Sequence, residues 1–175
     1  MKIILLTLVF FFFSPLLSAN VSYSGQENRP IKSLSESDML ALKNGSGWGL
    51  AKSAELNGLP GPVHVIELQE ELDLSESQLK QVQAIWQNMN SEAIKQGERY
   101  IQAEKAIERY FQERRDNAQE LKALLAHSAQ QLALLRGVHL DAHLKIKPIL
   151  SQHQVMLYKR HRGYDHSSAH HTNHH

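Results

Sequence analysis

The chain has 175 residues, with 19 Lys and Arg against 18 Asp and Glu. This near balance provides no basic face, so we expect no nucleic-acid partner. The absence of cysteine excludes a disulfide framework and thiolate metal sites. Eleven histidines stand out, because imidazole changes its charge at about pH 6.5 and is the commonest metal ligand in proteins.

The first residues have the pattern of a secretory signal. Lys2 supplies a positive start, residues 3–13 are apolar, and Ala19 ends the segment at which such signals are cut. The apolar run is short for a membrane span, which needs about 20 apolar residues. We therefore predict a cleaved signal peptide over residues 1–19 and export of the mature chain. An uncleaved N-terminal anchor is the alternative.

Short elements follow the signal. Residues 20–33 are polar and interrupted by glycine and proline, which predicts a loose N-terminal arm. Ser35 is typical of a helix cap and predicts a helix over residues 36–43. Further short helices are expected at about residues 49–57 and over residues 62–73, where a proline favours the first position of the second of them.

Two long helices dominate the rest of the sequence. Residues 76–113 contain no proline, and their buried positions recur every three or four residues, with Gln96 as the one clear interruption. After a short turn the same spacing continues over residues 117–149, so the two segments should pack as an antiparallel, coiled-coil-like hairpin. A last helix is expected over residues 151–161. No segment alternates like a strand.

The predicted fold is therefore all-α, with one helical domain over residues 34–164. It consists of a long antiparallel helical hairpin, short N-terminal helices and a short C-terminal helix. No enzyme is predicted, since the chain contains neither a glycine-rich phosphate loop nor a His-Glu-x-x-His helix.

The returning helix carries His139 and His143, which are four residues apart and therefore lie on one face. This spacing lets two imidazoles reach one metal ion, although a buried histidine is more often a hydrogen-bonded core residue. The hairpin register places Glu92 opposite His139, and a carboxylate near the core needs a partner. His64 is a further candidate, whose position the register does not fix. Such a site suits a divalent transition metal (Zn, Cu, Ni or Co) and leaves the choice open.

Residues 165–175 form a polar tail that we expect to be disordered. Its composition is typical of weak metal binding in several modes, and an appended purification tag is the alternative. The histidines of the tail are His166, His170, His171, His174 and His175.

Two helix starts share the pattern Leu-Ser-x-x-Gln, at residues 74–78 and 150–154. The stretch over residues 47–68, the long hairpin and the histidine-rich ends add to this pattern. Together these features make residues 23–164 resemble the Spy/CpxP group of periplasmic proteins and its heavy-metal-sensor and zinc-resistance relatives. The resemblance implies an all-helical, often cradle-shaped homodimer. It also implies metal ligands from an early histidine, a glutamate on the long helix and a pair on the returning helix. The matching positions here are His64, Glu92, His139 and His143.

The same resemblance implies a second activity, the ATP-independent holding of unfolded envelope proteins, and in the sensor branch a membrane signalling partner. Aromatic residues of the long helix could form an apolar client surface, or they could form the hairpin core or a dimer interface. These residues are Trp86, Tyr100, Tyr110 and Phe111. We therefore expect a periplasmic metal-binding protein of the sensor or resistance type, with a chaperone or envelope-stress adaptor as the alternative.

Overall fold

The computed structural model describes residues 23–164, and the regular elements in this part of the chain are all helical. The predicted all-α class is confirmed for these residues. None of their helices is both long and apolar enough to cross a membrane. The predicted signal peptide and the histidine-rich tail lie outside the described residues. The elements are η1 (Gln26–Asn28), α1 (Glu36–Lys43), α2 (Lys52–Glu55), α3 (Pro62–Glu67), α4 (Glu76–Gln112), α5 (Ala118–Ile146) and α6 (Gln152–His161).

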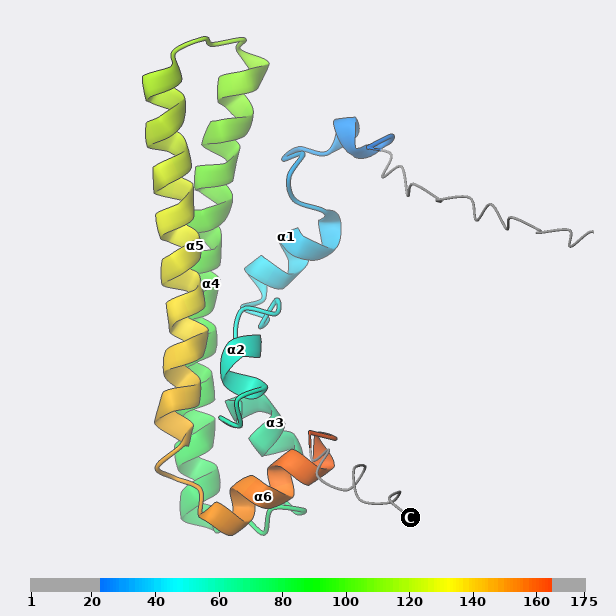
Figure 1. Cartoon of the computed structure of the whole chain (residues 1–175), viewed down its shortest axis with the longest axis vertical. Coiled ribbons are helices and arrows are strands. Elements are labelled where there is room, and N and C mark those ends of the chain that lie inside the picture. Colours follow the sequence, from blue (N-terminus) through cyan, green and yellow to red (C-terminus); the bar gives the residue numbers. More distant parts are fainter. Residues whose placement is uncertain (1–22, 165–175) are drawn as a thin grey trace, which may run out of the picture.

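Helices α4 and α5 run antiparallel and pack against each other, as predicted (Figure 1). Ser75 caps α4 by accepting a hydrogen bond from the backbone N–H of Gln78. The helix then continues for 37 residues, which makes it about 55 Å long. The expected interruption at Gln96 is a buried polar contact, in which its Nε2 donates to Gln131 Oε1 at 2.7 Å. Because a buried amide needs a partner, this pair helps to fix the register of the hairpin.

The segment from α1 to α3 lies along one side of the hairpin, and α6 folds back across the end at which α4 begins (Figure 1). Helices α1 and α3 contact α4, while α2 and α3 contact α5. Two of these helices are shorter than predicted. α2 is a single turn, and α3 ends at Glu67 because Leu68 leaves the helical dihedral region (φ −100°, ψ 24°). The residues up to Asp73 continue as turns that bury Leu72.

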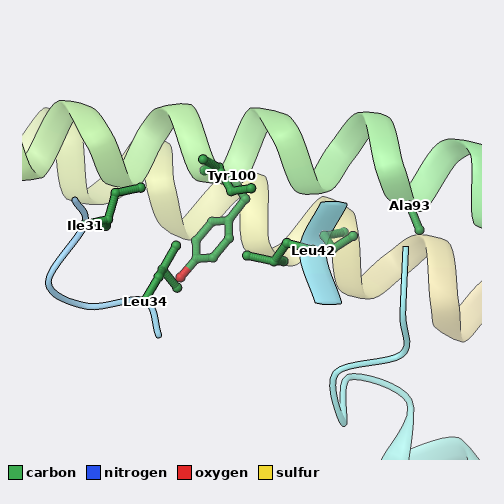
Figure 2. Packing of buried hydrophobic residues seen from close by; sticks show 7 residues of the cluster. Ile31, Leu34, Leu42, Ala93 and Tyr100 are labelled. Atoms are coloured by element: carbon green, nitrogen blue, oxygen red, sulfur yellow. The ribbon is translucent and has the colours of Figure 1, made fainter. Parts of the chain in front are cut away.

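The described end of the arm expected to be loose over residues 20–33 is anchored to the hairpin at Ile31 and Lys32. Ile31 is only 2% exposed, and burial of such a side chain contributes about 1.5–3 kcal/mol. The backbone N–H and Nζ of Lys32 both donate to the carboxylate of Glu108 in α4. Because most of the arm is polar, its sequence pattern did not indicate that Ile31 is buried. Ile31 belongs to the first of two core clusters. This cluster contains Ile31, Leu34, Leu42, Ala93, Tyr100, Ile101 and Leu135 (Figure 2).

The two Leu-Ser-x-x-Gln starts meet in the structure. Gln78 Nε2 donates to Gln154 Oε1 at 2.9 Å, and Gln154 Nε2 donates to Gln78 Oε1 at 3.1 Å. Each glutamine also completes the capping box of its own helix. The contact therefore joins the start of α4 to the start of α6 beside the second core cluster. That cluster contains Val65, Leu72, Val82, Ile146, Leu150 and Tyr158.

Gly97 allows α1 to approach α4 closely. A Cβ at this position would lie 2.5 Å from the carbonyl oxygen of Leu42, so Gly97→Ala must displace the backbone of α1. We expect the free energy of unfolding to fall by about 1 kcal/mol, since overpacking costs about 1–3 kcal/mol and the better helix propensity of Ala returns up to about 1 kcal/mol.

The matched control for this substitution is Gly137→Ala in α5, where a Cβ would meet no described atom within 4 Å. This variant should gain up to about 1 kcal/mol through helix propensity alone. Urea denaturation measures both effects. Equal changes in the two variants would contradict the close approach of α1 to α4.

Candidate functional site

A cavity of about 620 Å³ opens where the short N-terminal elements cross the hairpin. Its walls come from the loop over residues 44–49, from α2, from the start of α3, and from α4 and α5. Trp48 and Trp86, the two tryptophans of the chain, both line it. The Nε1 of Trp48 donates to Asp38 Oδ1 at 2.8 Å, which holds this part of the wall to α1. A largely apolar space of this size with a few polar groups is typical of a ligand site.

His143 is buried in the wall of this cavity, and a backbone carbonyl fixes its tautomer. Its Nδ1 lies 2.8 Å from the carbonyl oxygen of Leu59, so Nδ1 carries a proton, and in the neutral imidazole Nε2 has the lone pair. A Cβ at Gly61 would lie 3.2 Å from Nε2, so the glycine leaves space beside this nitrogen. Metal-ligating histidines are commonly oriented in this way, by donation from their second nitrogen to a carbonyl or carboxylate.

His139 lies one turn earlier on α5 and is 3% exposed. Its Nε2 is buried and has no hydrogen-bond partner within residues 23–164. Most buried polar side-chain atoms have such a partner, so this nitrogen requires an explanation. Burial, with a smaller contribution from the neighbouring His143, lowers the pKa of His139. The imidazole is therefore neutral at about pH 7, which is the form that binds metal.

The lowered pKa of His139 predicts a pH-dependent stability for the metal-free protein. Unfolded histidine titrates at about pH 6.5, so between that pH and the lower folded pKa the unfolded chain binds a proton that the folded chain does not. The free energy of unfolding should therefore fall as the pH is lowered through this window.

The test compares the wild type with His139→Gln in urea at pH 7.5 and 5.5, with a chelator present. The decrease between the two pH values should be larger in the wild type by up to about 1 kcal/mol. An identical decrease in both proteins would show that His139 is not responsible.

His64 of α3 lines the same cavity and is partly exposed. Its Nδ1 lies 2.8 Å from Glu67 Oε2, so Nδ1 donates to the carboxylate, and in the neutral imidazole Nε2 has the lone pair. The structure thus brings His64, which the sequence could not place, to the cavity of His139 and His143. In the described residues no group of three or more His, Asp or Glu side chains is already arranged to hold a metal ion. Binding in this cavity therefore requires the imidazoles to move closer together.

Glu92 is not brought together with the histidines. Its carboxylate is 60% exposed and pairs with Lys95 Nζ at 2.7 Å, which lowers its pKa. It lines a different depression, with Asp141 and Lys145 of α5. The position of Glu92 along the length of the hairpin is close to the predicted one, because it lines this depression with residues of α5 near His139. The register, however, does not determine on which side of the helix pair a residue lies, and Glu92 lies away from the cavity.

Glu55, the last residue of α2, is a largely buried carboxylate in the cavity wall that the sequence did not single out. Its Oε1 accepts hydrogen bonds from Tyr158 at 2.5 Å, Tyr164 at 3.1 Å and Arg162 at 3.3 Å, and its Oε2 lies 3.9 Å from His143 Nδ1. Burial and the hydrogen bond to Glu55 raise the pKa of Tyr158, so its hydroxyl stays protonated. These partners lie 103 to 109 residues later in the chain, so no local pattern signals them.

Comparison with known proteins gives no match: no family model, no curated protein and no solved structure is similar to this chain. The structure establishes an all-helical class with a packed pair of long helices. The finer assignment to the Spy/CpxP group stays a prediction from the sequence motifs.

Proposed function

We propose that this chain is a non-enzymatic protein that binds a divalent transition metal ion (Zn, Cu, Ni or Co) in the cavity, through His139, His143 and His64. The observation that carries the proposal is the buried Nε2 of His139, which has no partner among the described residues. Burying a polar atom without a hydrogen bond costs free energy. A metal ion would bind this nitrogen through its lone pair in the tautomer that is protonated on Nδ1.

The hydrogen bonds around the other two histidines support the same assignment. The Leu59 carbonyl and the Glu67 carboxylate accept hydrogen bonds from the Nδ1 atoms of His143 and His64, so the neutral form of each ring offers its Nε2 lone pair to a metal ion. Three imidazoles without a thiolate suit the late first-row divalent ions and zinc. A bound ion would connect α3 to α5, because His64 of α3 and the histidine pair of α5 would coordinate the same ion.

The wider proposal follows the sequence motifs. The protein acts in the periplasm after removal of the signal peptide, as a homodimer of the heavy-metal sensor or resistance type within the Spy/CpxP-like group. In a sensor, a membrane signalling partner would recognise the form of the protein in which the metal ion connects α3 to α5. A resistance protein would use the same link to retain the ion.

The two tryptophans allow a direct test. The protein without its signal peptide is titrated with Zn²⁺, Cu²⁺, Ni²⁺ and Co²⁺ while calorimetric heat and intrinsic fluorescence are recorded in parallel. At least one ion should bind and change the fluorescence over the same concentration range, because Trp48 and Trp86 line the cavity. Ca²⁺, which prefers oxygen ligands, is the control and should change neither signal. Heat of binding without any change in fluorescence would place the ion outside the cavity and contradict the proposal.

The alternative proposal is an ATP-independent chaperone or envelope-stress adaptor that holds unfolded envelope proteins. Tyr100 and Tyr110, expected as part of a client surface, are buried in the structure, whereas Phe111 is exposed. Leu56 and Val63 are also exposed, at the edge of the cavity, and support this alternative. An aggregation-suppression assay on an unfolded client, with and without metal, separates the two proposals. Absence of suppression at molar excess would rule out the holding activity.

A further inference from the structure

The two core clusters leave a gap along the seam between α4 and α5. On α4 the buried cluster members nearest to this gap are Val82 and Ala93. On α5 they are Leu135 and Ile146. The apolar seam of the hairpin is therefore interrupted at the level of the cavity. The side chains of α4 and α5 that lie in this gap and line the cavity are Trp86, Met89, Asn90, His139 and His143.

Met89 lies at the same level of the hairpin as His139. The contact between Gln96 and Gln131 fixes the register of the two helices. Moving seven residues from this contact along each helix leads to Met89 on α4 and to Val138, the neighbour of His139, on α5. Met89 and His139 also line the same cavity. Met89 is half-buried but belongs to neither core cluster, so core packing does not account for its thioether.

A thioether beside imidazoles favours a particular kind of ion. The sulfur of methionine is polarisable and uncharged, and such soft ligands select Cu⁺, which imidazole also binds. Zinc sites in proteins are instead built from imidazole, carboxylate and thiolate groups. Met89 therefore adds a ligand to the cavity that distinguishes a soft ion from Zn²⁺.

The charge of the cavity wall favours a monovalent ion as well. Among the described residues that line the cavity, Glu55 is the one carboxylate, and its Oε1 already accepts three hydrogen bonds. The thioether and the neutral imidazoles bring no negative charge. Because burying an uncompensated charge in apolar surroundings costs free energy, an ion with one positive charge is tolerated better here than an ion with two.

We infer that the cavity also binds the monovalent copper ion, Cu⁺, and that the thioether of Met89 coordinates it together with Nε2 of His139 and Nε2 of His143. This inference rests on the proposed function for the two imidazoles, and it deepens that function by naming a soft ligand and the ion that this ligand favours. Zn²⁺ would use the same imidazoles without the thioether. Met89 is then a residue that determines metal specificity.

The experiment measures Cu⁺ and Zn²⁺ affinities of the protein without its signal peptide, by competition with a chromophoric chelator. Cu⁺ is kept reduced under anaerobic conditions. The test variant is Met89→Leu, which conserves side-chain volume and therefore keeps the packing. Its matched control is Met156→Leu in α6, where the methionine is 58% exposed. All proteins share residues 165–175, so any binding there contributes equally. The His139→Ala/His143→Ala double variant tests the imidazoles.

We expect Met89→Leu to weaken Cu⁺ binding by about tenfold or more, since even loss of a group that only orients a ligand typically costs about 10- to 100-fold. Its Zn²⁺ affinity should change by no more than about twofold, because zinc sites do not depend on a thioether. Met156→Leu should leave both affinities unchanged. X-ray absorption at the copper edge provides a second measurement. The chain contains no cysteine, so a sulfur neighbour of copper must be a methionine, and it should be lost in Met89→Leu alone.

Unchanged Cu⁺ affinity in Met89→Leu, or an equal loss for Cu⁺ and Zn²⁺, would overturn the inference and leave the proposed function intact. Equal losses would mean that Met89 acts only through packing. A double variant that binds both ions as tightly as the wild type would instead contradict the proposed function itself, because the imidazoles of the cavity would then not hold the ion.

Discussion

Replacing His139 and His143 together by alanine should weaken binding of the preferred metal ion by about a hundredfold or more. Loss of a single residue that only orients a ligand typically costs about 10- to 100-fold in metal affinity, and this variant removes two ligands outright. Both side chains are buried, so alanine leaves space that a metal ion cannot use. The residual affinity would come from His64 and the tail.

The matched control is Glu92→Gln. The sequence placed Glu92 among the ligands, whereas the structure shows it exposed and paired with Lys95. Because exposed ion pairs contribute at most about 1 kcal/mol, we expect this variant to keep the wild-type metal affinity to within about twofold. Calorimetry measures both proteins. A large loss of affinity in Glu92→Gln would contradict its position outside the site and return Glu92 to the ligands predicted from the register.

Replacing Tyr158 by phenylalanine should lower the free energy of unfolding by about 2 kcal/mol, since hydrogen bonds to charged groups contribute about 1.5–3 kcal/mol. The Tyr158 side chain is fully buried in the second core cluster. Its hydroxyl donates to Glu55 and accepts from the backbone N–H of Gly61 at 3.2 Å. Phenylalanine keeps the ring but leaves both groups without this partner in a largely buried position.

Urea denaturation measures this effect, with Tyr23→Phe as the control. Tyr23 is 76% exposed, and substitution of an exposed side chain usually changes stability by less than about 0.5 kcal/mol. The difference between the two variants isolates the buried hydroxyl. Equal and small effects would contradict the hydrogen bonds that join α6 to α2 and to the turn before α3.

The helix boundaries were predictable where a capping residue marks them. Ser35, Ser75 and Ser151 each cap a helix with a reciprocal partner three residues later, because the local hydrogen bonds of a capping box depend on few residues. The hairpin was predictable for a similar reason, since the spacing of its buried positions is a property of each helix alone. The polar interruption at Gln96 was explained only by its partner across the hairpin, Gln131.

The candidate site was predictable only in part. The pair His139 and His143 followed from helical spacing, and the cavity confirms that they share one face. The positions of His64 and Glu92 depend on how the short N-terminal helices pack and on which side of the hairpin a side chain lies, and neither is encoded in helical periodicity. Glu55 lies on a single-turn helix, and its partners come from the opposite end of the chain. Only the tertiary structure brings these residues together.

We propose that a transition metal ion binds to the buried imidazole nitrogens of the cavity. The most direct measurement is a crystal structure of the protein soaked in the preferred ion, with anomalous scattering recorded at the absorption edge of that ion. We predict an anomalous peak in the cavity within bonding distance of Nε2 of His139 and Nε2 of His143. A peak found beside Glu92, or only at histidines of the tail with no density at His139, would contradict the account.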